Sequence, residues 1–168
     1  MPNDEEKTMT NPAQWKDSAS NVFVVAKTFG GISKWSVSNL KMQKILYLSH
    51  MVCLGRHKIP LVDTPFEAWD FGPVQPALYH KLKRFGSSNV RDVFYGEEIL
   101  TEGKGLSVLE DMSTLCSFSP GELVGITHRE GGAWSKVYRP GAKGIAIENF
   151  LISEEYTKLF LESNSNGR

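Results

Sequence analysis

The strongest pattern in the chain is a run of apolar residues between Ser38 and Gly55. Serine is a favoured N-cap residue, and glycine commonly follows the last turn of a helix. One side of the resulting helix carries Met42, Ile45, Leu46, Ser49, Val52 and Cys53, and the other side carries Leu40, Tyr47, Met51 and Leu54. A helix that is apolar on two sides is buried on two sides. We therefore predict that residues 38–55 form the central helix of the fold.

Five further helices are predicted from apolar residues at helical spacing and from capping residues. The best defined begins at Ser119-Pro120-Gly121-Glu122, a capping box with proline at the first helical position. Two glycines, Gly30 and Gly31, are expected to end the helix that precedes the central one. The five helices are expected over residues 19–30, over residues 76–86, over residues 106–116, from Ser119 and from Ser153.

The segment from Lys58 to Val74 has a different composition, because prolines and glycines alternate in it with aromatic residues. It has room for one short strand around Phe66–Asp70, and a second, weak strand is predicted near Val90–Tyr95. The pattern as a whole predicts a mainly α fold, which is a single compact helical domain of about six helices with one short β-hairpin.

Length and composition narrow the class of protein. The chain has 168 residues, which suits one domain with a sizeable core. Its polar, acidic start does not match a signal peptide, and its apolar runs are far shorter than the ~20 residues that span a membrane. Two cysteines without a close pairing pattern suit a reducing compartment. We therefore expect a cytoplasmic protein without a membrane partner.

Charge is balanced over the chain but uneven along it. The 19 Lys and Arg residues equal the 19 Asp and Glu residues, so the general basic excess of a dedicated nucleic-acid binder is missing. Residues 34–91 hold nine basic and three acidic residues, whereas residues 92–122 hold seven acidic and one basic. These blocks either form two solvated faces or steer partners of different charge toward the protein.

Patterns typical of catalysis or metal binding are weak. His50, Cys53 and His57 would share one helix face and are zinc-type ligands, but Gly55 is expected to end the helix and no fourth ligand is placed by spacing. Cys53 and Cys116 lack a nucleophile signature, and a buried apolar role is the simpler interpretation of both. The glycines form no phosphate-binding motif. We therefore predict no enzyme activity, no metal and no cofactor.

Two segments, residues 67–79 and 123–134, combine aromatic residues with residues that fix the backbone. Tryptophan, tyrosine and arginine are enriched in the energetically dominant parts of protein interfaces. Trp69 and Trp134 are either core residues or binding residues on this basis. In the helix predicted over residues 76–86, Lys83 and Arg84 point away from the apolar side, so their charges are available to a partner.

Three ordered segments resemble motifs of the Panacea domain family, the SocA-like antitoxins of bacteria. The first is Leu40-Lys41-Met42-Gln43-Lys44-Ile45-Leu46-Tyr47, similar to the family's K-L-Q-K-L-L-Y helix. The second is Glu67-Ala68-Trp69 with Phe71-Gly72-Pro73-Val74, Pro76 and Tyr79, and the third is Leu123 with Thr127-His128-Arg129-Glu130 and Trp134. The resemblance extends from Ala19 to Phe160, and we expect one domain over residues 12–162. Residues 1–11 and 163–168 are polar and unpatterned, so we expect a flexible lead-in and a flexible tail.

The resemblance also implies a function. Family members neutralise a protein toxin by binding it, and the SocA-like case delivers its toxin to the ClpXP protease. We expect such a role here, with Trp69, Tyr79, Lys83, Arg84, His128 and Trp134 as the partner-binding residues, and we predict that the four aromatic residues among them lie near one another or near a groove. The alternative is a DNA-binding regulator of the protein's own operon, for which His80, Lys81, Lys83 and Arg84 form only a small basic cluster.

Overall fold

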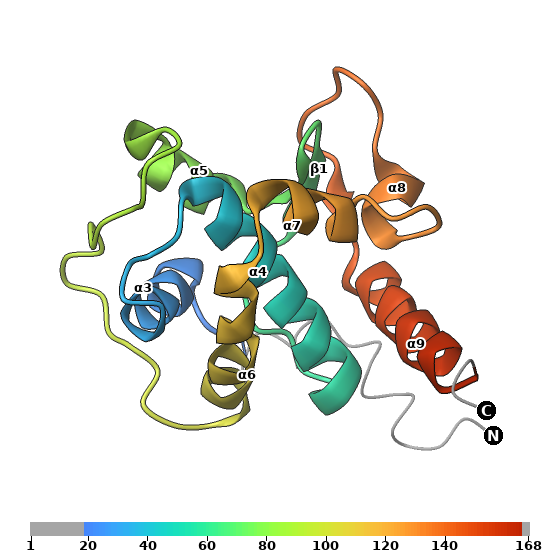
Figure 1. The fold of residues 1–168 in the computed structure, drawn as a ribbon, viewed down its shortest axis with the longest axis horizontal. Helices are drawn as coiled ribbons and strands as arrows, with labels where there is room; N and C mark the ends of the chain where they lie inside the picture. Colours follow the sequence, from blue (N-terminus) through green and yellow to red (C-terminus); the bar gives the residue numbers. More distant parts are fainter. Residues whose placement is uncertain (1–18, 166–168) are drawn as a thin grey trace.

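The computed structural model describes residues 19–165 and shows a helical protein built around one buried helix (Figure 1). That helix, α4 (Asn39–Val52), crosses the middle of the molecule and contacts most of the other elements. Residues 1–18 and 166–168, which include the predicted lead-in and the end of the predicted tail, lie outside the described part. Within residues 19–165, the structure has no helix that is both long and apolar enough to cross a membrane.

Seven α-helices and three short strands make up the described part of the chain, which confirms the predicted mainly α fold with a hairpin. The helices besides α4 are α3 (Val22–Ile32), α5 (Pro76–Leu82), α6 (Lys104–Met112), α7 (Pro120–Thr127), α8 (Ala133–Val137) and α9 (Asn149–Ser165). Shorter helical turns extend three of them: η1 (Cys53–His57) follows α4, η2 (Lys83–Phe85) follows α5, and η3 (Ser113–Ser117) follows α6.

The strands form one antiparallel sheet in the order β2-β1-β3. Strands β1 (Phe66–Trp69) and β2 (Gly72–Val74) make the predicted hairpin, in which Ala68 pairs with Pro73. The third strand, β3 (Ala146–Ile147), pairs with the other edge of β1. The hairpin lies against α4 and brings the segment around Gly72 to the middle of that helix.

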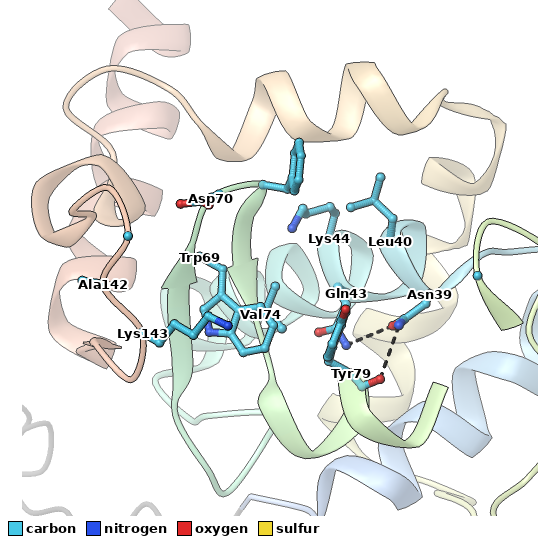
Figure 2. A pocket seen from close by; sticks show the side chains of 13 residues that line it. Asn39, Leu40, Gln43, Lys44, Trp69, Asp70, Val74, Tyr79, Ala142 and Lys143 are labelled. Carbon is cyan, nitrogen blue, oxygen red and sulfur yellow. Dashed lines mark hydrogen bonds between the residues drawn. The ribbon is translucent and has the colours of Figure 1, made fainter. Parts of the chain in front are cut away.

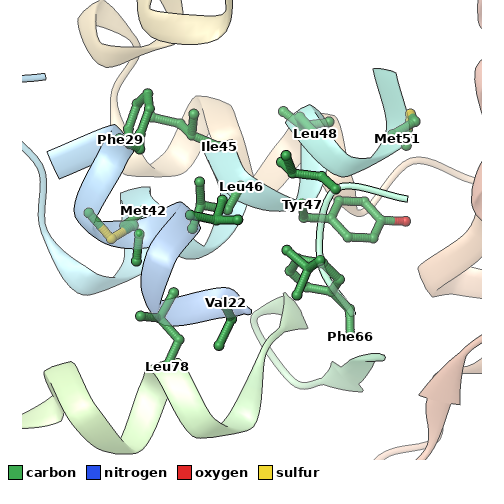
Figure 3. Close-up of a cluster of buried hydrophobic side chains, with 14 of the residues drawn as sticks. Val22, Phe29, Met42, Ile45, Leu46, Tyr47, Leu48, Met51, Phe66 and Leu78 are labelled. Carbon is green, nitrogen blue, oxygen red and sulfur yellow. The ribbon is translucent and has the colours of Figure 1, made fainter. Parts of the chain in front are cut away.

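The core confirms that α4 is buried on both of its predicted sides. Eleven of its fourteen residues are buried, so it has almost no solvent-facing stripe. Ile45 and Leu46 come from one side and Tyr47 from the other, and all three are fully buried (Figure 3). The Tyr47 ring meets Phe66 of β1 edge to face, with 5.3 Å between ring centroids. This packing joins the helix to the hairpin.

One predicted strand is wrong, and one predicted helix begins earlier than expected. Residues 90–95 form no strand, because Val90, Val93 and Phe94 are buried by packing against the core instead of by pairing in a sheet. The last helix begins at Asn149, not at Ser153, whose side chain is buried inside that helix. In both places a local sequence signal is overridden by tertiary contacts.

The predicted stops at glycines are also displaced. Helix α3 continues through Gly30 and Gly31 to Ile32. After α4, the chain passes through Gly55 as a wider helical turn, and it ends at Lys58 in the left-handed conformation. Gly55 has a packing role there, because a Cβ at this position would lie 1.9 Å from Cδ1 of Tyr156. The glycine lets α9 approach the end of the central helix.

A substitution at Gly55 tests this close approach. Gly55→Ala should destabilise the protein by about 1–3 kcal/mol, because the added methyl group overlaps the Tyr156 ring. The free energy of unfolding is measured by urea titration. Gly31→Ala is the matched control, since no atom lies within 4 Å of a Cβ at Gly31. If both variants are equally stable, α9 does not pack on Gly55 as described.

Candidate functional site

A pocket of about 380 Å³ lies where the hairpin, α4 and α5 meet (Figure 2). The first turns of α4 contribute Asn39, Leu40, Gln43 and Lys44, and the hairpin contributes Trp69, Asp70, Phe71 and Val74. Tyr79 of α5, Gly86 and the loop residues Gly141, Ala142 and Lys143 complete its lining. Two of the three segments singled out in the sequence therefore meet in one pocket.

One wall of the pocket is aromatic. The rings of Trp69 and Tyr79 meet edge to face, with 5.0 Å between their centroids. The indole Nε1 of Trp69 donates a hydrogen bond to Glu67 Oε1 at 3.1 Å, which fixes the ring on the hairpin. An aromatic pair held in this way provides a rigid apolar surface.

The third segment supports the hairpin from the other side. His128, which follows α7, stacks on Trp134 of α8 with 3.8 Å between ring centroids. The indole Nε1 of Trp134 donates to the carbonyl oxygen of Trp69 at 2.8 Å. Tyr138 stacks on the other face of Trp134 and its hydroxyl donates to Asp70. This stack holds the tip of the hairpin in position.

Gln43 joins the pocket to the start of α5. Its Oε1 accepts a hydrogen bond from the Gln75 amide at 2.8 Å, and its Nε2 donates to Asn39 Oδ1 at 3.2 Å. The Gln75 side chain in turn caps α5 by accepting from the Leu78 amide at 2.9 Å. The buried glutamine thus places Tyr79, one turn further along α5, at the pocket wall.

Lys44 lies at the base of the pocket and is fully buried. Its Nζ donates to the carbonyl oxygen of Pro73 at 3.0 Å and forms no ion pair with any carboxylate of the described residues. Burial lowers the pKa of this amine from 10.5 to about 7. The pocket therefore contains an amine whose charge is poorly compensated.

A second nitrogen lies next to Lys44. A Cβ at Gly72 would lie 3.1 Å from both Lys44 Nζ and His128 Nε2, so the two side chains converge on this glycine. His128 Nε2 is buried and has no hydrogen-bond partner in the part of the chain that the structure describes. Burial lowers the pKa of His128, the nearby polar backbone of Phe71 raises it, and the neighbouring Lys44 lowers it. Gly72 also has a φ of 108°, which other residues rarely adopt.

The mouth of the pocket is apolar and basic. Phe71, at the tip of the hairpin, is 72% exposed although it is a large apolar residue. Lys143 is exposed on the loop opposite. Phe71 and Lys143 therefore place apolar and basic surface at the entrance of the pocket.

Four of the six predicted site residues are brought together. Trp69 and Tyr79 line the pocket, while His128 and Trp134 form the stack behind the hairpin. Lys83 and Arg84 are exposed on η2 and do not line it, and Arg84 lies over the ring of Phe85 at 5.4 Å. The part that each of the six plays in binding a partner, or DNA, stays a prediction.

Sequence reasoning missed Gln43, Lys44 and Phe71 as site residues. A lysine within a helix apolar on two sides was the available signal for Lys44, because such a position is buried. For Gln43 and Phe71, the only signal was their place in the motif segments.

The histidine and cysteine candidates have other roles in the structure. Both ring nitrogens of His50 are engaged: Nδ1 accepts from the amides of Leu61 and Val62, each at 3.2 Å, and Nε2 bonds Asn149 Oδ1 at 2.8 Å. Burial lowers the pKa of His50 to about 4 and raises that of the Cys53 thiol to about 12. His50 is therefore a neutral structural residue, and Cys53 is a protonated one. Within residues 19–165 no three such side chains cluster as metal ligands.

The separate motif segments thus come together in and behind one pocket, in a mainly helical fold. The family model described as "Antitoxin SocA-like, Panacea domain" matches residues 42–135, and the chain belongs to this family. The chain is also 30% identical over 135 residues to Antitoxin SocA of Caulobacter vibrioides (strain NA1000 / CB15N), which covers 71% of this chain and 72% of that protein. No solved structure matches the chain.

The burial of Lys44 makes stability depend on pH. Between about pH 7 and 10.5 the unfolded chain holds a proton on Lys44 that the folded protein does not, so the stability of the wild type rises with pH in this range. Lys44→Met removes this titration. The wild type should gain up to about 1.4 kcal/mol per pH unit relative to Lys44→Met, as measured by urea unfolding at pH 7 to 10. If the free energies of unfolding of the two proteins change with pH in parallel, the Lys44 amine stays charged in the folded protein.

Proposed function

We propose that this protein neutralises a protein toxin by binding it directly, with the pocket and the exposed Phe71 at the centre of the interface. Membership of the SocA-like antitoxin family supports the general role. The single observation that favours this surface is Phe71, a large apolar side chain left 72% exposed on a well-fixed hairpin beside a pocket. A rigid aromatic residue of this kind contributes strongly to binding, because little side-chain entropy is lost.

We further propose that the protein acts as an adaptor that hands its toxin to the ClpXP protease. An adaptor needs two surfaces and no catalytic group. The pocket occupies one side of α4, while helix α9 presents exposed Phe150 and Phe160 elsewhere on the protein. A second partner can therefore be held without displacing the first.

A growth assay tests toxin binding. The gene adjacent to that of this protein is expressed alone, with the wild type, or with Phe71→Ser. Phe71→Ser should weaken toxin binding by about thirty-fold or more and abolish the rescue of growth. Tyr95→Ser is the matched control, because Tyr95 is 85% exposed but does not line the pocket, and it should rescue as the wild type does.

The adaptor role is tested separately, by following toxin half-life in cells with and without ClpXP. A half-life shortened by this protein only when ClpXP is present supports delivery to the protease. Rescue with abundant toxin in both strains would leave neutralisation by binding and reject the adaptor. Toxin that is bound equally well by the wild type and by Phe71→Ser would reject the proposed surface.

A further inference from the structure

Two lysines, Lys44 and Lys143, and one aspartate, Asp70, are among the described residues that line the pocket. Lys44 has three N–H donors, and the carbonyl of Pro73 accepts from one of them. Within residues 19–165, Asp70 is the only acidic residue that lines the pocket, and it accepts a hydrogen bond from the Tyr138 hydroxyl at the surface. A buried amine in this situation gains strongly from an incoming anion.

His128 lies behind the pocket lining and brings a second nitrogen close to Lys44. Its Nε2 is buried at Gly72, next to Lys44 Nζ, and has no hydrogen-bond partner within residues 19–165. Buried polar atoms of native proteins are nearly always paired, so an unpaired one beside a pocket is a place for a ligand atom. Lys44, which Figure 2 shows with its nitrogen directed toward the hairpin side, and His128 define one polar corner.

The rest of the pocket favours an apolar group. Leu40, Val74, Trp69 and Phe71 line it, and Tyr79 adds a second aromatic ring. A volume of about 380 Å³ is in the range of specific ligand pockets. The ligand that matches both halves of the pocket is an apolar group that bears a carboxylate.

The terminal residue of a polypeptide combines these two features. Its side chain is available to the apolar walls and its α-carboxylate to the polar corner, and no backbone has to leave the pocket on the far side. An acidic side chain within a chain brings a carboxylate without an apolar group, and it also brings two peptide units that need hydrogen bonds. The nitrogens of Lys44 and His128 and the apolar walls of the pocket together therefore favour the C-terminal end of a polypeptide.

We propose that the pocket binds the C-terminal residue of a partner protein, with its carboxylate at Lys44 and His128 and an apolar side chain against Trp69 and Tyr79. This assignment rests on the proposed function, because it names the part of the toxin that the surface recognises. The proposal also gives Lys44, which is fully buried in the protein alone, a direct contact with the partner.

Short peptides test the chemistry without any knowledge of the toxin. The full-length protein, labelled with ¹⁵N, is titrated to millimolar peptide with an acetylated tetrapeptide that ends in leucine, with the same peptide as its C-terminal amide, and with an amidated peptide that carries an internal glutamate. The free acid should shift the signals of the Trp69 indole and of residues around Gly72, and it should bind at least about ten-fold more tightly than either amide. Equal binding of acid and amide, tighter binding of the glutamate peptide, or no shifts with any of the three would overturn the proposal.

Two variants separate the charge from the shape of the pocket. Lys44→Met keeps a side chain of similar length and should reduce the affinity for the free acid to that for the amide. Lys104→Met, an exposed lysine at the start of α6 outside the pocket, is the matched control and should bind as the wild type does. The spectrum of each variant without peptide is recorded first, to check that the variant is folded. A folded Lys44→Met that keeps the ten-fold preference for the acid contradicts the assignment.

An experiment with the toxin itself connects peptide binding to the proposed function. Removing the carboxylate of the toxin, by extending its C-terminus with a glycine–serine tail, should weaken its binding by at least about ten-fold. If the extended toxin binds normally while Phe71→Ser fails to bind it, the proposed function stands and the C-terminal assignment is wrong. If neither change affects binding, the toxin uses another surface and the proposed function itself is wrong.

Discussion

Helix α4 is enclosed on nearly all sides, so the polar groups that it carries must find their partners inside the protein. Gln43 bonds the backbone at Gln75, Lys44 bonds the carbonyl of Pro73, and His50 bonds the amides of Leu61 and Val62. These contacts fix the start of α5, the second strand of the hairpin and the loop that leads to the first strand. The polar residues of one buried helix thereby help to position the hairpin and α5, which form most of the pocket.

The parts of the fold that could be predicted are those in which one local signal agrees with the tertiary structure. The two apolar sides of α4 predict its central position, and the capping box at Ser119 forms as predicted, with hydrogen bonds in both directions between Ser119 and Glu122. Gly55 and Ser153 mislead because glycine and serine have several uses. At Gly55 the missing side chain serves packing against Tyr156, and at Ser153 a small residue is buried inside a helix. Both uses depend on α9, whose position the sequence around these residues does not specify.

The grouping of some candidate residues could be predicted from residue type and from the motif segments. Trp69, Tyr79 and Trp134 are of types enriched at interfaces, His128 belongs to the third motif segment, and the structure groups all four around the hairpin. Lys44 could not be selected by that reasoning, since a helical lysine is usually exposed. What makes it unusual is the hairpin and His128 that close over it, and these come from segments far from it in the chain.

A buried lysine that pairs with no carboxylate of the described residues is costly for a small domain, even though its hydrogen bond to the Pro73 carbonyl holds the second strand of the hairpin. The neighbouring positions on α4 are filled by Ile45, Leu46 and Tyr47, which are all fully buried. Places where a sequence departs from such local rules are characteristic of function. Lys44 Nζ, His128 Nε2 and the exposed Phe71 meet at the same hairpin, and the proposed partner accounts for all three, because it would cover Phe71 and bring an acceptor to the two nitrogens.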